Sequence, residues 1–247
     1  MSSVPVVQPS PRRLRTVALI GIDGSGKTTQ ARLLAAELSR SGLPATYHQN
    51  AGGRRWFGRL AERFGRDDAQ DLLGRRLMLL VESVLRWLAI ARALLRRVRS
   101  GDVAVMDRYA ACQYASLRAR GRGRAGERLA RVAYSVFPRP DVTFLLAVRP
   151  EVAWQRVETR GYDHEDLGDL RAADAAYRDL PEHAHVVVVD ANGTLDEVAA
   201  AIRGHLAAYL PAAQPLPRQR PAVSGVLAAP ALADYASAVT PLAQAAA

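Results

Sequence analysis

One lysine stands among the chain's 34 basic residues, inside a glycine-rich run whose residue types and spacing suit phosphate binding. The run reads GIDGSGKTT and fits the phosphate-loop pattern G-x-x-x-x-G-K-[ST] in full. The residues expected to bind a nucleoside triphosphate are Gly21, Ile22, Asp23, Gly24, Ser25, Gly26, Lys27, Thr28 and Thr29. The other 33 basic residues are arginine. The one lysine, Lys27, stands where a compact ammonium on a flexible side chain must fit between phosphate oxygens.

The chemistry of such a loop gives its residues separate roles. Backbone N–H groups of residues 24–28 would surround the β-phosphate, helped by the N-terminus of the following helix. Lys27 would neutralise charge on the β- and γ-phosphates, and the Thr28 hydroxyl would ligate Mg²⁺. The alternative is a glycine-rich turn that matches by accident, and the strand and helix expected on either side disfavour it. The run therefore predicts ATP as a ligand and Mg²⁺ as a cofactor.

A second group of candidate residues follows another apolar run. Val103–Met106 predicts a buried strand that ends at Asp107, where an acidic residue commonly holds Mg²⁺ directly or through water. A strand-end aspartate is otherwise a helix cap or turn residue, but the upstream phosphate loop favours the metal ligand. Arg108 follows at the carboxyl end of the predicted sheet, where ligands of open α/β sheets bind. An isolated arginine there could equally be a surface charge.

Alternating strands and helices must position these residues. Thr16–Ile20 is apolar without alternation, which predicts a strand buried on both faces of a parallel sheet. Further strands are predicted at Ala45–His48, Val103–Met106, Asp141–Val148 and His185–Val189. Helices are predicted at Lys27–Arg40, Gln70–Arg99, Pro150 to about Arg160, residues 167–180, and Thr194–Leu210. This order predicts an α/β fold with a doubly wound, five-stranded parallel sheet flanked by helices.

The two ends of the chain differ in composition from its middle. Residues 1–14 are rich in Pro, Ser and Arg, and residues 211–247 in Ala and Pro, so we expect both segments to be disordered. The predicted folded domain spans residues 15–210. The chain's apolar content of 49% is ample for the core of such a domain.

Composition also limits the partners and the compartment. The net charge of +10 favours anionic partners, yet the arginines are scattered along the chain, and solvated faces account for most of them. Because Cys112 is the only cysteine, a disulfide framework and a cysteine-based metal site are excluded. Residues 1–15 lack the apolar core of a signal peptide, and Leu77–Leu95 carries charged residues. We therefore expect a cytoplasmic protein without a membrane partner.

The phosphate loop with Asp23 inside it, together with Asp107-Arg108-Tyr109, resembles the thymidylate kinase family of phosphate-loop nucleoside monophosphate kinases. Residues 140–161 resemble that family's strand-to-lid stretch, and residues 190–194 its late loop near the adenine. The similarity extends over roughly residues 14–208. It implies a nucleotide-kinase fold with a short lid, and ATP- and Mg²⁺-dependent phosphorylation of a nucleoside monophosphate, most simply dTMP to dTDP.

The resemblance implies acceptor-binding roles for particular residues. Asp23 would contact the acceptor's sugar hydroxyl, and Arg108 would bind the acceptor phosphate with Tyr109 beside it. Arg86 falls where the family has an acceptor-contacting arginine on its long helix. Asp23 could instead stabilise the loop, and Arg86 could be an exposed helical charge.

Arg156 and Arg160 would belong to a lid that closes on ATP. They lie four residues apart, hence on one helical face, and the phosphate loop itself contains no arginine. Either could instead be a solvated charge. With these two included, the residues expected to be catalytic are Lys27, Asp107, Arg108, Arg156 and Arg160.

The acceptor side departs from the family's pattern. Arg54 or Arg55 would have to replace the arginine that grips the acceptor phosphate. Val81 and Glu82 stand where the family has a thymine-stacking phenylalanine. After Asp107-Arg108-Tyr109 the family has a serine and a Tyr-Gln pair that contact the acceptor. Cys112, Ser116 and Leu117 stand at those positions here.

These departures leave the acceptor's base open and keep two other functions in view. One is a phosphate-loop kinase for a different nucleotide or a specialised small-molecule acceptor. The other is a nucleotide-dependent switch or nucleic-acid-associated NTPase that uses Arg118–Arg131, although residues 117–131 hold no interleaved aromatics. We also expect a homodimer through the long helix at residues 70–99, which is too apolar to face water on both sides.

Overall fold

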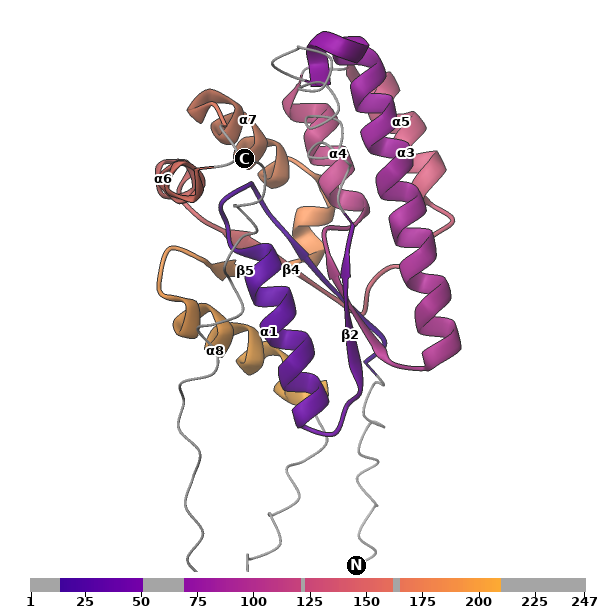
Figure 1. The fold of residues 1–247 in the computed structure, drawn as a ribbon, viewed down its shortest axis with the longest axis vertical. Helices are drawn as coiled ribbons and strands as arrows, with labels where there is room; N and C mark the ends of the chain where they lie inside the picture. Colours follow the sequence, from indigo (N-terminus) through magenta and orange to yellow (C-terminus); the bar gives the residue numbers. More distant parts are fainter. Residues whose placement is uncertain (1–13, 51–68, 121–122, 162–164, 210–247) are drawn as a thin grey trace, which may run out of the picture. The chain divides into compact units, whose positions relative to one another are not determined.

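Five strands form one parallel sheet in the computed structural model, which describes residues 14–50, 69–120, 123–161 and 165–209 (Figure 1). The strands are β1 (Thr16–Ile20), β2 (Ala45–Gln49), β3 (Val103–Asp107), β4 (Val142–Ala147) and β5 (Val187–Asp190). Their order across the sheet is β2-β3-β1-β4-β5, and every neighbouring pair is parallel. The predicted five-stranded, doubly wound parallel sheet is confirmed.

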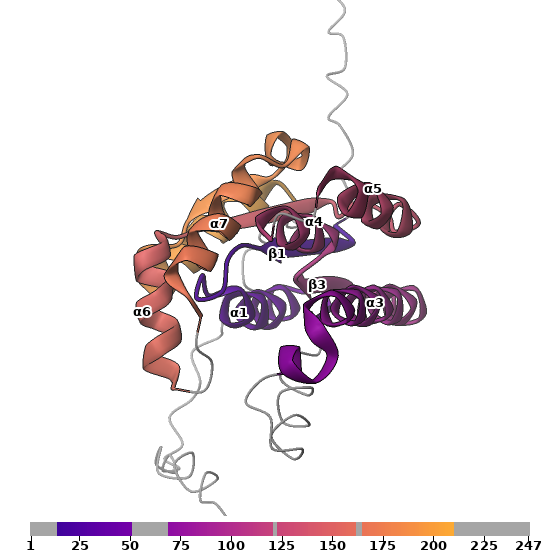
Figure 2. The same ribbon diagram turned by 90° about the horizontal axis from the view of Figure 1, so that it is seen from above.

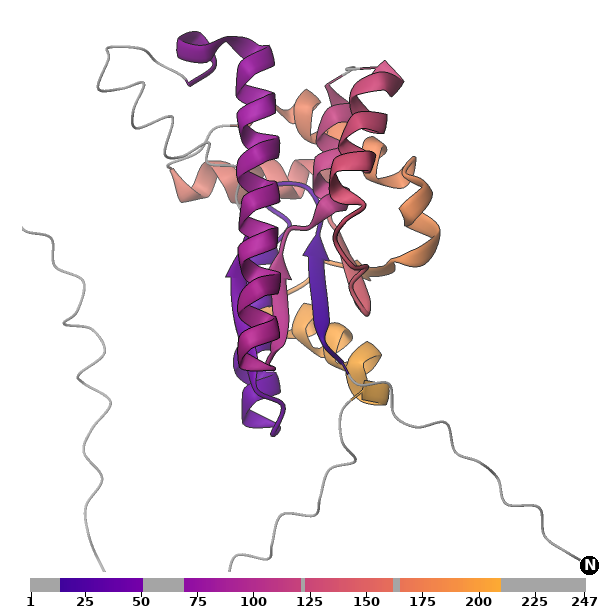
Figure 3. The same ribbon diagram turned by 90° about the vertical axis from the view of Figure 1, so that its right-hand side faces the viewer.

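Helices connect the strands and cover both faces of the sheet. They are α1 (Lys27–Arg40), α3 (Ala69–Ser100), α4 (Ala110–Ala119), α5 (Gly123–Tyr134), α6 (Pro150–Arg160), α7 (Leu167–Arg178) and α8 (Leu195–Leu206), with short 3₁₀ turns η1 (Pro181–His185) and η2 (Ala207–Tyr209). Seen from above, α1 and α3 lie on one side of β1 and β3, and α4 and α5 on the other (Figure 2). Helix α3 runs alongside the sheet and extends past the carboxyl ends of the strands (Figure 3).

The central strands are apolar because helices cover them on both faces. All five residues of β1 and all five of β3 are buried, which is the burial that a continuous apolar run without alternation predicts. In the register of these strands Leu19 lies beside Asp107. The chain leaving β1 and the chain leaving β3 therefore start side by side, and the phosphate loop and Arg108 follow from adjacent strand ends.

Local sequence signals explain where the later helices begin and end. Pro150 opens α6, and Gly161 ends it in the left-handed conformation, with φ 70°. The Asp166 side chain accepts hydrogen bonds from backbone N–H groups at the start of α7. Thr194 and Glu197 form a capping box at the start of α8. These signals fix the segments that flank the sheet's carboxyl edge.

Some predicted boundaries were wrong. The fifth strand is Val187–Asp190 rather than His185–Val189, because Pro181 starts a 3₁₀ turn that occupies residues 181–185. The closing helix ends at Leu206 and continues as a 3₁₀ turn instead of reaching residue 210. Residues 1–13 and 210–247 lie outside the described residues, so the domain boundaries and the disorder of both ends stay predictions.

Two helices, α4 and α5, were not predicted at all. Helix α4 is buried at Ala110, Cys112, Gln113, Tyr114 and Ala115, so its sequence carries no single apolar stripe from which a helical period could be read. Helix α5 begins in a run of glycine and arginine that resembles a loop. Within the described ranges, no helix has both the length and the apolarity that a membrane crossing requires.

Candidate active site

The phosphate loop joins β1 to α1, and its glycines adopt conformations that other residues rarely reach. Gly24 and Gly26 have φ of 83° and 88°. A β-carbon on Gly24 would lie 2.3 Å from the Ala153 carbonyl oxygen, so the loop packs directly against the first turn of α6. The loop's shape therefore depends on glycine at position 24, as the motif requires.

Lys27 is buried within this loop, at 5% exposure. Its ammonium donates to the Ile22 carbonyl at 2.5 Å and to Ser25 Oγ at 3.3 Å, and lies 3.6 Å from Asp23 Oδ1. Burial lowers the pKa of Lys27 and the Arg108 charge lowers it further, while Asp23 and Asp107 oppose the shift. Burial outweighs the two carboxylates, so the pKa of Lys27 lies below its usual value in the empty loop.

Thr28 and Asp107 come together at the ends of adjacent strands. Thr28 Oγ1 donates to Asp107 Oδ2 at 2.6 Å, and the Tyr47 hydroxyl donates to the same oxygen at 3.1 Å. Asp107 Oδ1 is buried and has no hydrogen-bond partner among the described residues. A hydroxyl beside a carboxylate with a spare buried oxygen is the hard oxygen donor set that suits Mg²⁺.

The few protein ligands at this position also suit Mg²⁺. No cluster of three or more His, Cys, Asp or Glu able to hold a metal occurs in the described part of the chain. Mg²⁺ in nucleotide sites usually keeps several waters and takes one or two carboxylates plus substrate phosphates. The residues present therefore fit an ion shared with the nucleotide.

Arg108 adopts an uncommon backbone conformation immediately after β3. Its φ of 75° lies in the left-handed region, which is uncommon outside glycine. Two backbone contacts hold it there: its N–H donates to Leu19 O at 3.0 Å, and Asn50 Nδ2 donates to its carbonyl at 2.7 Å. The guanidinium forms an ion pair with Asp23 of the phosphate loop. Strained residues of this kind concentrate at functional sites.

A second arginine, Arg86, lies buried on α3 at 6% exposure. Its Nη1 donates to Gln113 Oε1 on α4 at 2.6 Å. Tyr177 of α7 is hydrogen-bonded to Cys112 and feels the charges of both Arg108 and Arg86. Burial raises the pKa of the Tyr177 hydroxyl, so it stays protonated. Side chains from α3, α4 and α7 therefore gather around the carboxyl end of β3.

Two other predicted acceptor-side residues have different surroundings. Tyr109 is buried, and its hydroxyl donates to the Pro138 carbonyl at 2.7 Å, so this hydroxyl anchors a neighbouring loop. Glu82 is buried at 3% exposure and pairs with Arg120 at 3.5 Å. A carboxylate thus occupies the helix position where the resemblance implies a stacking ring. Arg54, Arg55 and residues 162–164 of the predicted lid lie outside the described residues.

A pocket of about 660 Å³ opens beside the phosphate loop. It lies between the loop, α6 and the start of α8, and its lining includes Gly24, Thr29, Arg156, Arg160, Gly193 and Thr194. The pocket brings the phosphate loop, both predicted lid arginines and the predicted late loop to one place.

The two lid arginines differ in how they are held. Arg156 donates to the carbonyls of Ala191, Asn192 and Gly193, at 2.9, 3.2 and 3.2 Å. It therefore fixes the late loop against α6. Arg160 lies in the last turn of α6 and is exposed at the pocket's rim. Arg156 therefore forms part of the pocket wall, whereas Arg160 is the more exposed of the two cations.

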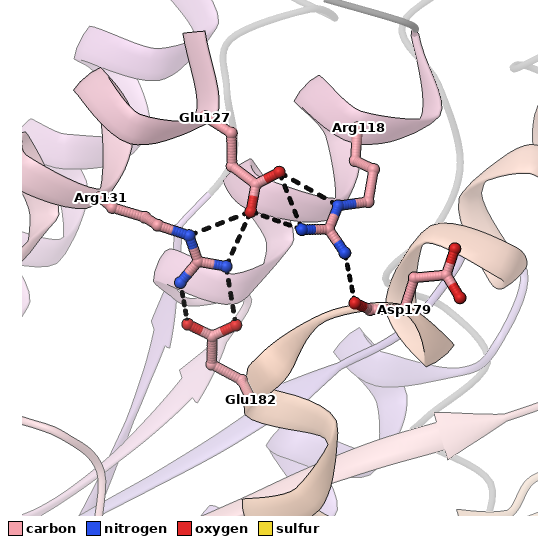
Figure 4. Close-up of polar contacts among 5 residues, drawn as sticks. All are labelled: Arg118, Glu127, Arg131, Asp179 and Glu182. Atoms are coloured by element: carbon pink, nitrogen blue, oxygen red, sulfur yellow. Dashed lines mark hydrogen bonds and ion pairs between the residues drawn. The ribbon is translucent and has the colours of Figure 1, made fainter. Parts of the chain in front are cut away.

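Arginines in the last turns of α4 and α5 form ion pairs within the protein. Arg118 and Arg131 both bond to Glu127, and Arg131 also pairs with Glu182 (Figure 4). Burial alone would raise the pKa of Glu127, but hydrogen bonds from Arg131 and Arg118 outweigh burial and lower it. Arg118 further donates to the Asp179 carbonyl. The charges of Arg118 and Arg131 are therefore balanced locally, which argues against an anionic polymer as the partner of these two residues.

Sequence reasoning missed several of these contacts. Gln113 gave one signal, a long polar side chain inside an otherwise apolar stretch, but its partner could not be read from the chain. Tyr177 and Tyr47 gave no signal, because tyrosines on a helix and an edge strand are common in a core. Only the packing of α4 and α7 over the strand ends shows what they contact.

Sequence similarity to known proteins identifies the family of this chain. The Thymidylate kinase family profile matches residues 20–202. A probable thymidylate kinase of Archaeoglobus fulgidus is 31% identical over 200 residues, covering 78% of this chain and 95% of that protein. A thymidylate kinase of Xanthomonas euvesicatoria is 32% identical over 197 residues, covering 74% and 78%. One of Ectopseudomonas mendocina is 29% identical over 207 residues, covering 79% and 96%. The chain belongs to the thymidylate kinase family and is a phosphotransferase.

Proposed function

We propose that the protein transfers the γ-phosphoryl group of ATP to dTMP, giving dTDP and ADP, with Mg²⁺ as cofactor. One observation carries the proposal: Lys27, the Thr28–Asp107 pair and the Asp23–Arg108 pair meet at the carboxyl ends of two adjacent strands. The donor phosphates and the acceptor phosphate would meet at this point. Relatives named thymidylate kinase supply the choice of acceptor.

The chain's own residues divide the work of the reaction. An acceptor phosphate oxygen attacks the γ-phosphorus in line, and the bond from that phosphorus to the bridging oxygen breaks as ADP leaves. No nucleophilic side chain is required, so the protein contributes positioning and charge. Lys27 neutralises the donor phosphates, and Arg108, held by Asp23, binds the acceptor phosphate. Thr28 and Asp107 would hold Mg²⁺, which supplies further charge neutralisation on the β- and γ-phosphates.

The pocket beside α6 would take the nucleoside part of ATP. Arg156 shapes its wall through the carbonyls of residues 191–193. Arg160, at the rim, would bring the positive charge that the phosphate loop lacks to the transferring phosphoryl group. Closure of this region would exclude water and so suppress hydrolysis of ATP.

A second candidate function is the same transfer to a different acceptor. Buried Glu82 favours it, because a carboxylate offers no aromatic face on which a thymine could stack. Both candidates are separated by a coupled assay of ADP release over a panel of nucleoside monophosphates. Turnover with dTMP well above every other acceptor supports the first. Turnover on another acceptor with none on dTMP would overturn it.

We also propose a homodimer formed through α3, in the cytoplasm where its nucleotide substrates are found. The support is an exposed apolar stripe along that helix, with exposed fractions of 59, 49, 52, 51 and 72% at Leu80, Val84, Leu88, Leu95 and Val98. Large exposed apolar stripes usually mark protein interfaces. Sedimentation velocity should find a dimer that Leu88→Glu converts to monomer. A monomeric unmodified chain at micromolar concentration would refute the dimer.

A further inference from the structure

Tyr47, on the edge strand β2, reaches the carboxylate of the proposed metal site. In the parallel register it stands beside Val105, and Asp107 lies two residues further along β3. Because side chains alternate between the two faces of a sheet, Tyr47, Val105 and Asp107 project from the same face. A tyrosine side chain is long enough to reach a diagonal neighbour on the next strand. The Tyr47 hydroxyl thereby donates to Asp107 Oδ2 at 3.1 Å.

The two oxygens of the Asp107 carboxylate have different surroundings. Oδ2 also accepts a hydrogen bond from Thr28 Oγ1, in the first turn of α1, at 2.6 Å. Donors from two separate elements therefore meet at this one oxygen. Oδ1 is buried and has no hydrogen-bond partner among the described residues. The protein thus uses one oxygen of the carboxylate and leaves the other for a ligand.

This difference between the oxygens depends on how the carboxyl group is turned. The last torsion of an aspartate side chain is broad and roughly two-fold, so rotation readily exchanges the two oxygens. With Thr28 as the only donor, the carboxylate of Asp107 could pivot about a single hydrogen bond. The Tyr47 hydroxyl holds Oδ2 from a second element, and so it fixes the direction of Oδ1. Hydrogen bonds of this kind orient carboxylates that ligate metals.

Tyr47 is itself held in place from α1. Arg32 follows Thr28 by four residues and therefore lies on the same side of that helix. The guanidinium carbon of Arg32 lies 5.1 Å from the centroid of the Tyr47 ring, within the range of a cation–π contact. The ring also packs against the hydrophobic core. Helix α1 thus supplies both the hydroxyl that shares Asp107 Oδ2 and the cation that covers the Tyr47 ring.

We propose that Tyr47 is a positioning residue of the metal site, whose hydroxyl orients the Asp107 carboxylate and keeps Oδ1 available to Mg²⁺. Tyr47 acts through Asp107 and takes no part in the transfer itself. This inference rests on the proposed Mg²⁺-dependent kinase function. A hydroxyl that only satisfies a buried oxygen would affect the stability of the protein and leave its Mg²⁺ requirement unchanged.

Tyr47→Phe tests this role because it removes the hydroxyl and keeps the ring. At saturating ATP and dTMP, the Mg²⁺ concentration for half-maximal rate should rise about tenfold. The kcat at saturating Mg²⁺ should return to the wild-type value, since excess metal fills the weakened site. Thr46→Val is the matched control. It removes a hydroxyl of the same strand that donates to Asp102 at 2.9 Å, and it should leave the Mg²⁺ requirement unchanged.

A second measurement follows ATP binding without turnover. Calorimetric titration of ATP into each variant is carried out with Mg²⁺ and again with EDTA, in the absence of acceptor, and thermal unfolding confirms that the variants are folded. Tyr47→Phe should weaken ATP binding about tenfold with Mg²⁺ and leave it unchanged in EDTA. An equal loss in EDTA would overturn the proposal, because the hydroxyl would then support the phosphate loop rather than the metal site.

The remaining outcomes separate this role from the proposed function. A folded Tyr47→Phe with wild-type Mg²⁺ requirement and wild-type ATP binding would overturn the role of Tyr47 and leave the kinase function intact. Absence of transfer to any nucleoside monophosphate would overturn the proposed function, whereas the ATP titrations would still decide the role of Tyr47. A wild-type protein whose ATP binding and turnover are indifferent to Mg²⁺ would overturn both the cofactor and its positioning residue.

Discussion

The donor side and the acceptor side of the site are built in different ways. On the donor side, nine consecutive residues form the loop, and the Lys27 ammonium already has Ile22, Ser25 and Asp23 as partners. On the acceptor side, α3, α4 and α7 each contribute side chains, and Arg86 and Gln113 keep buried donors without partners in the described chain. In the proposed function, a loop of backbone N–H groups binds phosphate, whereas side chains from several helices would select the acceptor.

The largest expected effect tests the donor side. Lys27→Arg keeps the positive charge but replaces a compact ammonium with a larger, planar guanidinium. We expect that the guanidinium does not fit among Ile22, Ser25 and Asp23. We expect kcat to fall about a thousandfold or more. The assay is ADP release at saturating ATP and dTMP. Arg40→Lys, the opposite exchange at the exposed end of α1, is the matched control and should retain full activity. Near-normal turnover of Lys27→Arg would show that charge alone suffices there.

The next effect tests the link between the two sides. Asp107→Asn keeps an oxygen at the position of the carboxylate but removes the charge that would hold Mg²⁺ beside Thr28. We expect kcat to fall about a hundredfold and the Mg²⁺ concentration for half-maximal rate to rise. Activity is measured across a Mg²⁺ titration. Asp102→Asn, whose carboxylate pairs with Thr46 at the start of β3, is the control. An unchanged Mg²⁺ requirement would contradict the proposed metal site.

A smaller and selective effect tests the acceptor side. Arg86→Lys keeps a cation but loses Nε and the geometry of the Gln113 contact. The KM for the acceptor should rise about tenfold, with the KM for ATP unchanged. Initial-rate kinetics with each substrate varied in turn separate the two constants. Arg92→Lys, exposed on the same helix, should leave both unchanged. An equal rise in both KM values would mean that the two sides are not independent.

The smallest effect is expected outside both sides. Arg118→Gln breaks the pair with Glu127 and should lower the free energy of unfolding by about 0.5–1 kcal/mol without changing kcat. The folded-state pKa of Glu127 is lowered, so this contribution is present above the ordinary carboxyl pKa and is lost as the pH falls through the folded-state value. Urea unfolding of wild type and Arg118→Gln at neutral and acidic pH should therefore converge at low pH. A change in kcat would place this network in the catalytic machinery.

The sequence predicts the donor side well because its information is local. The apolar run of β1, the glycines of the loop and Pro150 at the start of α6 each act within a few residues of where they stand. Helix α4 escapes such reasoning, since tertiary contacts bury it on several sides and leave no amphipathic stripe. The Gln113–Arg86 contact joins residues on separate helices, and no spacing rule relates them. Arg156 was expected in a lid that closes on ATP. Its bonds to the carbonyls of residues 191–193 could not be predicted, because they depend on how α6 packs against that loop.

The lone lysine has a practical consequence for watching this protein at work. Reagents that acylate amines find two kinds of target in the chain, its α-amino group and the ε-amino group of Lys27. The lowered pKa of Lys27 increases its neutral, nucleophilic fraction, while burial in the loop restricts access. Phosphates bound in the loop would cover it. The mass of one proteolytic fragment would then report the fraction of molecules holding nucleotide, in a mixture and without a labelled ligand.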